Sequence, residues 1–109
     1  QGVDVEEDFM SVIAVNPRFN PGRLMITRNA KDTLPHSEVN AAIQRHLHGD
    51  WGELCDLEQQ ANEDALKNGG RLMSVYSTRD AVKFWIITEA DYSTTTVLLP
   101  SDYSRGRAA

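Results

Sequence analysis

The chain has 109 residues, of which 40% are hydrophobic and 25% are charged, and its formal net charge is −5. This length suits one domain with its own hydrophobic core. The excess of 16 acidic over 11 basic residues argues against a general nucleic-acid binder, because such proteins need a basic surface to displace counterions from phosphate.

The single cysteine, Cys55, excludes an internal disulfide, so the fold does not need an oxidising compartment. No apolar run approaches the roughly 20 residues of a membrane-spanning helix, and no signal-peptide pattern is present. These features predict a cytoplasmic protein without membrane association. No cofactor is expected, because no phosphate-binding glycine loop or zinc-ligand repeat is present.

Three regions are predicted along the chain. Gln1-Gly2 resembles the scar of a removed purification tag, and residues 1–18 read as this scar plus an extension with a short apolar segment at 9–15. Residues 19–103 form a single domain. Residues 104–109 are expected to be a disordered tail.

The front half of the domain predicts one strand and two helices. Residues 23–27 read as a strand, and a helix is expected from Pro35 to its C-terminal Gly49, with one apolar stripe along it. A second helix begins near Asp56, where a capping box with Gln59 is expected. Its inner stripe would hold Leu57, Ala61 and Ala65, and the two helices should pack as antiparallel neighbours.

The back half predicts three strands, over residues 71–78, 82–89 and 94–99, because these segments are rich in β-branched and aromatic residues. Their connections are short enough for hairpins, so neighbouring strands should pair antiparallel. The result is an α+β fold of order β-α-α-β-β-β. Its three- to four-stranded, mainly antiparallel sheet carries a two-helix layer on one face.

The alternation along these strands is apolar on both faces, whereas a sheet with one face in water alternates apolar with polar residues. One face would hold Leu72, Tyr76, Phe84, Ile86 and Leu98. The other face is the candidate interface and would hold Met73, Val75, Trp85, Ile87, Val97 and Leu99. Two helices cover only one face, so residues 9–15 or a second copy of the chain must cover the other. We expect a homodimer.

The densest polar cluster lies at the corner between the two predicted helices. Its candidate functional residues are His46, His48, Asp50, Trp51, Glu53 and Cys55. Two histidines and a thiol so close together suggest a metal site, but residues two apart on a helix point about 200° apart. No metal is therefore predicted, and the histidines suit the negative end of a helix dipole.

Cys55 and Trp51 each have two interpretations. With a nearby histidine, Cys55 forms the minimum pair for thiol catalysis, although no nucleophile motif surrounds it and a buried structural cysteine is the commoner case. Trp51 is expected to plug the helix corner against the sheet. Its functional alternative is a recognition aromatic at the rim of a pocket.

Residues 50–64 carry six carboxylates and no basic side chain. Such a run is usually a solvated helix face, and its functional interpretation is an acidic surface for a basic partner. Arg18, Arg23, Arg28 and Lys31 form an opposing basic stretch, which could contact the acidic helix of a second copy.

Several motifs in order resemble a family of short proteins carried on bacterial plasmids, integrated elements and other mobile DNA. The matching blocks are His46 with Gly49-Asp50-Trp51-Gly52, then W-I-I-T-E-A-D at 85–91, then T-T-V-L-L-P at 95–100. The resemblance covers residues 19–103 and implies no established activity. Some members carry an automatic label as a type I restriction–modification subunit.

That label does not fit these residues. A methyltransferase needs an Asn/Asp-Pro-Pro-aromatic motif, and the only candidate is Asn16-Pro17-Arg18. The chain is also too short for a doubly wound cofactor domain.

Three hypotheses of function follow. The first is a small non-enzymatic binding protein carried on mobile DNA, homodimeric and with an unidentified protein partner. The second is a metal- or thiol-dependent enzyme at residues 46–56. The third is an acidic inhibitor of a host defence system, acting through carboxylates such as Asp56, Glu63 and Asp64. The lack of a recognisable catalytic motif favours a non-enzymatic role and leaves the question of an enzyme open.

Overall fold

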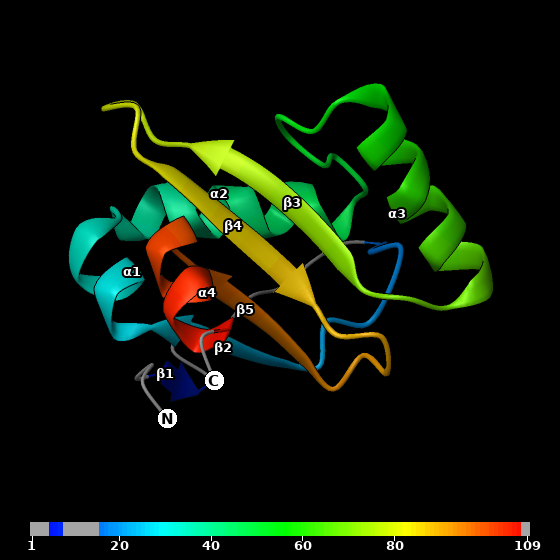
Figure 1. Ribbon diagram of the computed structural model, residues 1–109, viewed down its shortest axis with the longest axis horizontal. Helices are drawn as coiled ribbons and strands as arrows, with labels where there is room; N and C mark the ends of the chain where they lie inside the picture. Colours follow the sequence, from blue (N-terminus) through cyan, green and yellow to red (C-terminus); the bar gives the residue numbers. More distant parts are fainter. Residues whose placement is uncertain (1–4, 8–15, 108–109) are drawn as a thin grey trace.

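The computed structural model describes residues 5–7 and 16–107, which form an α+β fold around one mixed sheet (Figure 1). The strand order is β1-β2-β5-β4-β3. The strands are β1 Val5–Glu7, β2 Arg23–Thr27, β3 Leu72–Ser77, β4 Lys83–Thr88 and β5 Thr94–Leu98. β2 runs parallel to β5, and the other neighbours are antiparallel. The predicted fold class and the antiparallel meander of β3 to β5 are confirmed.

Four helices surround the sheet in the described part of the chain. They are α1 Arg28–Thr33, α2 His36–Leu47, α3 Asp56–Asn68 and α4 Pro100–Arg107. α2 crosses one face of the sheet, α4 lies over the opposite face, and α3 runs beside β3 (Figure 1). α3 packs mainly against this strand, so the expected antiparallel pairing of two helices was wrong. Within the described residues, none of these helices has the length and apolarity needed to cross a membrane.

Sequence patterns did not predict α1 and α4. α1 is a six-residue helix with a single buried side chain, Ala30, so it has no apolar periodicity to detect. Its N-terminus is capped by Thr27, whose hydroxyl accepts a hydrogen bond from the Ala30 N–H (3.1 Å). α4 covers part of the segment expected to be a tail and is held by Asp102, a buried residue that accepts hydrogen bonds from Thr27 and Asn29.

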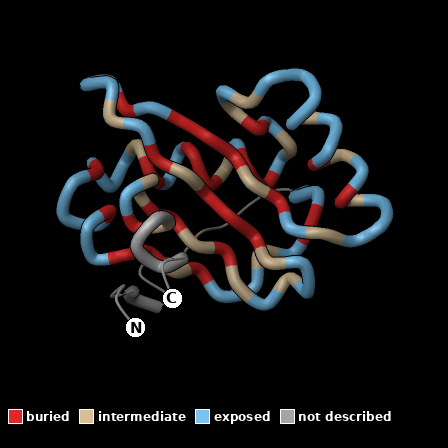
Figure 2. Tube along the Cα trace, viewed as in Figure 1, coloured by how far each residue is buried: buried red, intermediate tan, exposed pale blue. Residues whose placement is uncertain are grey.

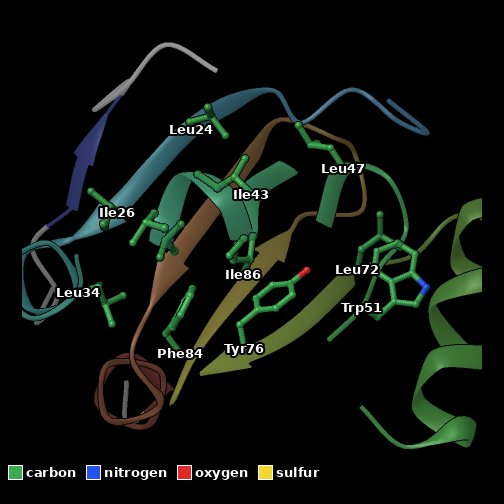
Figure 3. Packing of buried hydrophobic residues seen from close by; sticks show 14 of the residues in the cluster. Leu24, Ile26, Leu34, Ile43, Leu47, Trp51, Leu72, Tyr76, Phe84 and Ile86 are labelled. Atoms are coloured by element: carbon green, nitrogen blue, oxygen red, sulfur yellow. The ribbon is translucent and has the colours of Figure 1, made fainter. Parts of the chain in front are cut away.

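The main core lies between α2 and the sheet face beneath it, called here the inner face (Figures 2 and 3). α2 contributes the predicted stripe of Val39, Ile43 and Leu47, all of which are buried. The inner face consists of Leu24, Ile26, Leu72, Ser74, Tyr76, Phe84, Ile86, Thr88, Thr95 and Val97. Three of these residues carry hydroxyl groups on short side chains, which sets up the polar contacts described below.

The opposite face, called the outer face, holds the apolar residues Met25, Met73, Val75, Trp85, Ile87 and Leu98 and the polar residues Arg23, Thr27, Ser77, Lys83, Thr94 and Thr96. The assignment of Val97 to this face was wrong. Val97 pairs with Ile86 and is fully buried on the inner face, while Leu98 pairs with Trp85. A shift of one residue in strand register exchanges the two faces. Leu99 follows β5 and packs against the main core.

α4 supplies part of the second cover that the sequence requires. Its Tyr103 ring meets the Trp85 ring edge-on, with centroids 5.2 Å apart, and its hydroxyl accepts a hydrogen bond from Arg71 (2.9 Å). The other expected cover, the apolar segment at 9–15, lies outside the described residues. Met25, Met73 and Trp85 remain half-buried on this face.

α3 begins at the predicted residue but turns a different side toward the fold. Its N-cap is Cys55, whose N–H donates to the Glu58 carboxylate (3.0 Å), so the capping box lies one residue earlier than expected. Leu57, expected inside, is 80% exposed. The buried positions are Asn62 and Ala65.

The free edge of β3 is closed by α3 and by the corner before it. The Asn62 side chain accepts from the Met73 N–H (3.2 Å) and donates to the Met73 carbonyl (2.8 Å). Further along, Val75 exchanges backbone hydrogen bonds with Trp51 and Glu53. These contacts satisfy the strand edge in place of a further strand.

Candidate functional site

The corner between α2 and α3 joins the last turn of α2, the Gly49–Gly52 bend and the start of α3. His46 lies on the side of α2 that faces the sheet and is fully buried. Its Nδ1 atom is 2.6 Å from the Ser74 hydroxyl, and its Nε2 atom is 2.9 Å from the Thr88 hydroxyl. The Thr88 hydroxyl is 2.7 Å from that of Thr95, which donates to the Pro21 carbonyl (2.7 Å).

This chain of contacts defines the tautomer of His46. A carbonyl only accepts, so Thr95 uses its one hydroxyl proton on Pro21 and must accept from Thr88. Because the Thr88 hydroxyl donates its proton to Thr95, it must accept the hydrogen bond from Nε2–H of His46. Nδ1 is left as the acceptor for the Ser74 hydroxyl. The imidazole is therefore neutral, with its proton on Nε2.

Burial lowers the pKa of His46 from 6.5 to about 3. Removing an imidazolium from water is costly, and the described surroundings offer it no carboxylate. Protonation would also place a second N–H opposite Ser74, which would have to give up its donor role. His46 is thus a structural member of the core rather than a group that titrates near neutral pH.

Trp51 plugs the corner as predicted, with 2% of its surface exposed. Its indole N–H donates to the Glu63 carboxylate on α3 (3.0 Å). The same carboxylate receives two hydrogen bonds from the Arg18 guanidinium, at 2.9 and 3.0 Å. The Arg18 hydrogen bonds, followed by that of Trp51, lower the pKa of Glu63 to about 2.

Phe19 completes this arrangement from the N-terminal side. Its ring centroid lies 5.3 Å from that of His46 and 6.4 Å from that of Trp51, and its ring is also stacked near Tyr92. The residue before it, Arg18, donates its backbone N–H to the Leu47 carbonyl at the end of α2 (2.8 Å). Residues 18 and 19 are therefore held at the corner by the aromatic contacts of Phe19 and by the ion pair between Arg18 and Glu63.

The remaining polar candidates form contacts within the fold. Asp50 pairs with Arg45 (2.7 Å), and this hydrogen bond is the main reason that the pKa of Asp50 is lowered. Glu53 forms a surface ion pair with Lys83 (3.1 Å). His48 is exposed, and its Nδ1 atom lies 2.7 Å from the Gln44 carbonyl.

His46 and His48 therefore diverge, one into the core and the other into solvent. Cys55 is exposed at the start of α3. In the described part of the chain, no group of three His, Cys, Asp or Glu side chains could hold a metal ion. The corner brings Trp51 and His46 into contact but does not gather the six candidates around one reacting centre.

Sequence reasoning missed the residues that organise this corner. Arg18 and Glu63 are 45 positions apart, and Ser74 and Thr88 look like ordinary strand residues. Small polar residues at inner-face positions of an otherwise apolar strand were the available signal, because a buried hydroxyl requires a partner.

We expect Glu63→Ala to lower the free energy of unfolding by about 1–2 kcal/mol, because the buried indole N–H of Trp51 loses its acceptor. Glu63→Gln keeps an acceptor for Trp51 and should cost less. Urea unfolding followed by tryptophan fluorescence measures both. Asp64→Ala is the matched control on the exposed side of α3, and its effect should stay within about 0.5 kcal/mol. Equal losses for Ala at 63 and 64 would contradict this assignment.

The resemblance to proteins carried on mobile DNA rests on motifs that the structure places at the corner, in β4 and in β5. Gly52 makes the close approach to β3, Trp51 fills the corner, and Thr88 and Thr95 bond to His46 or to each other. These are positions on which the fold depends, and the family assignment stays a prediction. Comparison with protein-family models, with curated proteins and with solved structures found no match to this chain.

Proposed function

We propose that the chain is a small non-enzymatic binding protein that forms a homodimer through the outer sheet face. The observation that carries the proposal is the apolar centre of this face. It presents Met25, Met73 and Trp85 as half-buried side chains around the buried Val75 and Ile87. α4 covers only part of this face, and apolar side chains left partly exposed on a sheet are typical of contact surfaces.

The corner supports a binding role more than a catalytic one. His46 uses both ring nitrogens inside the core, and Asp50, Glu53 and Glu63 each pair with a basic side chain. The metal- or thiol-dependent enzyme finds no support in this geometry. The inhibitor hypothesis is weakened too, since Glu63 is held by Arg18 and is not available as a phosphate mimic.

Sedimentation over a wide range of concentrations tests the dimer. The wild-type chain is expected to show the mass of a dimer, dissociating on dilution. Thr96→Lys places a charge on β5, between Met25 and Ile87 in the two neighbouring strands, and should give a monomer. Thr33→Lys, at the exposed end of α1, is the matched control and should stay dimeric.

A wild-type chain that is monomeric at all concentrations would refute the dimer. Thermal unfolding of Thr96→Lys separates dimer loss from unfolding. A folded Thr96→Lys variant that remains dimeric would place the interface on another surface.

A further inference from the structure

An apolar pocket of about 190 Å³ lies between α3 and the edge of the sheet. Its lining residues are Leu54, Glu58, Ala61, Asn62 and Met73. It is smaller than the roughly 300–1,000 Å³ typical of small-molecule sites. A volume of this size suits one large apolar side chain rather than a metabolite.

The surface beside this pocket is also apolar. Leu57 is 80% exposed and is the only large hydrophobic side chain classed as exposed among residues 16–103. It precedes Ala61 by one helical turn, so the two form a short exposed ridge along α3. An apolar ridge next to an apolar pocket is the usual form of a surface that receives an amphipathic helix.

The charge around this surface is mostly negative, with Lys67 in the last turn of α3 as the basic residue that follows it. Residues 53–66 contain five carboxylates and no basic residue. Glu63 and Glu53 are neutralised by Arg18 and Lys83, while Glu58 lines the pocket and Asp64 lies one turn beyond Gln60 on the exposed side. Asp64 is also close in the helix to Ala61, so carboxylates flank the apolar ridge.

We infer that the groove formed by Leu54, Leu57, Ala61 and Met73, called here the α3 groove, binds a basic amphipathic helix of a partner protein. One apolar side chain of the partner fills the pocket, and its lysines or arginines face Glu58 and Asp64. We assign the partner to another protein because, of these four groove residues, only Met73 also lies on the outer face, through which the proposed dimer forms. The inference rests on the proposed binding role but not on dimerisation.

The probe is a synthetic helical peptide with leucines at i, i+4 and i+7 and lysines on the remaining faces. Fluorescence anisotropy should show saturable binding of one peptide per chain, weakened by salt. Two control peptides, with glutamate in place of lysine or serine in place of leucine, should not bind. Amide shifts in NMR should be confined to α3, residue 54 and the start of β3.

The decisive variant is Ala61→Glu, which narrows the groove while making the surface more acidic. If the peptide binds in the α3 groove, its affinity for this variant should be about tenfold weaker, because an anchoring side chain is excluded. If the peptide binds only by non-specific charge attraction, its affinity should increase. Ala41→Glu makes the same change at an exposed alanine of α2 and should bind as the wild type does.

Absence of binding by the lysine–leucine peptide, equal affinity of the wild type and Ala61→Glu, or amide shifts elsewhere would each overturn the inference. It would also be overturned if Ala61→Glu altered the sedimentation mass, since the groove would then receive a second copy. Thr96→Lys should still bind the peptide, which distinguishes failure of the groove from failure of the dimer.

Discussion

Acidification from pH 7 to pH 4 is expected to lower the free energy of unfolding by about 3 kcal/mol through His46 alone. The pKa of this residue is about 3 in the folded chain and 6.5 when it is exposed. Below pH 6.5 the unfolded chain therefore binds a proton that the folded chain does not. Stability is complete above this value and is lost as the pH falls toward 3.

His46→Gln isolates this effect. Glutamine keeps one donor and one acceptor for Ser74 and Thr88 without a titrating group. We expect the variant to be less stable at pH 7 by about 1–2 kcal/mol but to lose less stability on acidification than the wild type. Urea unfolding at a series of pH values measures both slopes.

His48→Gln is the matched control, because His48 is exposed and lies two residues away. The loss of stability between pH 7 and pH 4 should persist in this variant, because His46 is still buried. In the wild type, nitrogen chemical shifts of His46 should report a neutral ring with its proton on Nε2. An unchanged pH slope in His46→Gln, or a proton on Nδ1, would contradict the hydrogen-bond chain described above.

Gly52→Ala is expected to lower the free energy of unfolding by about 3 kcal/mol or more. Gly52 has φ +76°, and a Cβ atom there would collide with the Val75 carbonyl oxygen and lie 2.9 Å from the Tyr76 ring. The corner would have to move away from β3. Hydrogen exchange at Val75 and Glu53, whose N–H groups cross this contact, should accelerate.

Gly69→Ala provides the matched control. Gly69 also has a positive φ, +91°, but a Cβ atom there meets no other atom within 4 Å. Its substitution therefore carries only the cost of placing an alanine at φ 91° and ψ 149°, a conformation that essentially only glycine adopts, which is about 1–3 kcal/mol. Similar losses at 52 and 69 would show that backbone conformation, and not the approach to β3, makes glycine necessary at Gly52.

Local sequence patterns were sufficient to predict the positions of most strands and of the two longest helices. The strand at Arg23–Thr27 was predicted with its observed bounds, and the three strands of the meander and the start of α3 lie where β-branched runs and a helix-start signal placed them. These features are encoded by neighbouring residues, since periodicity and capping act over a few positions.

Sequence patterns gave the wrong buried side where the alternatives differed by one residue of strand register or by a rotation of a helix about its axis. Val97 and Leu98 are both apolar, so nothing local says which of them faces α2, and pairing with β4 decides it. On α3 the apolar stripe predicted Leu57 inside, but the demand of the β3 edge for a hydrogen-bonding partner turns Asn62 inward instead. Satisfying a strand edge outweighs burying one leucine.

At the corner between α2 and α3, too, the sequence predicted the location of the residues but not their contacts. The sequence located the cluster from His46 to Cys55 and assigned Trp51 its place as a plug, because a tryptophan between glycines at a helix end has few other uses. Which polar residues pair was decided only by the tertiary structure, since Arg18 meets Glu63 and His46 meets Thr88 across 45 and 42 positions. Contacts over such separations depend on how the sheet and helices pack, and packing is a property of the whole chain.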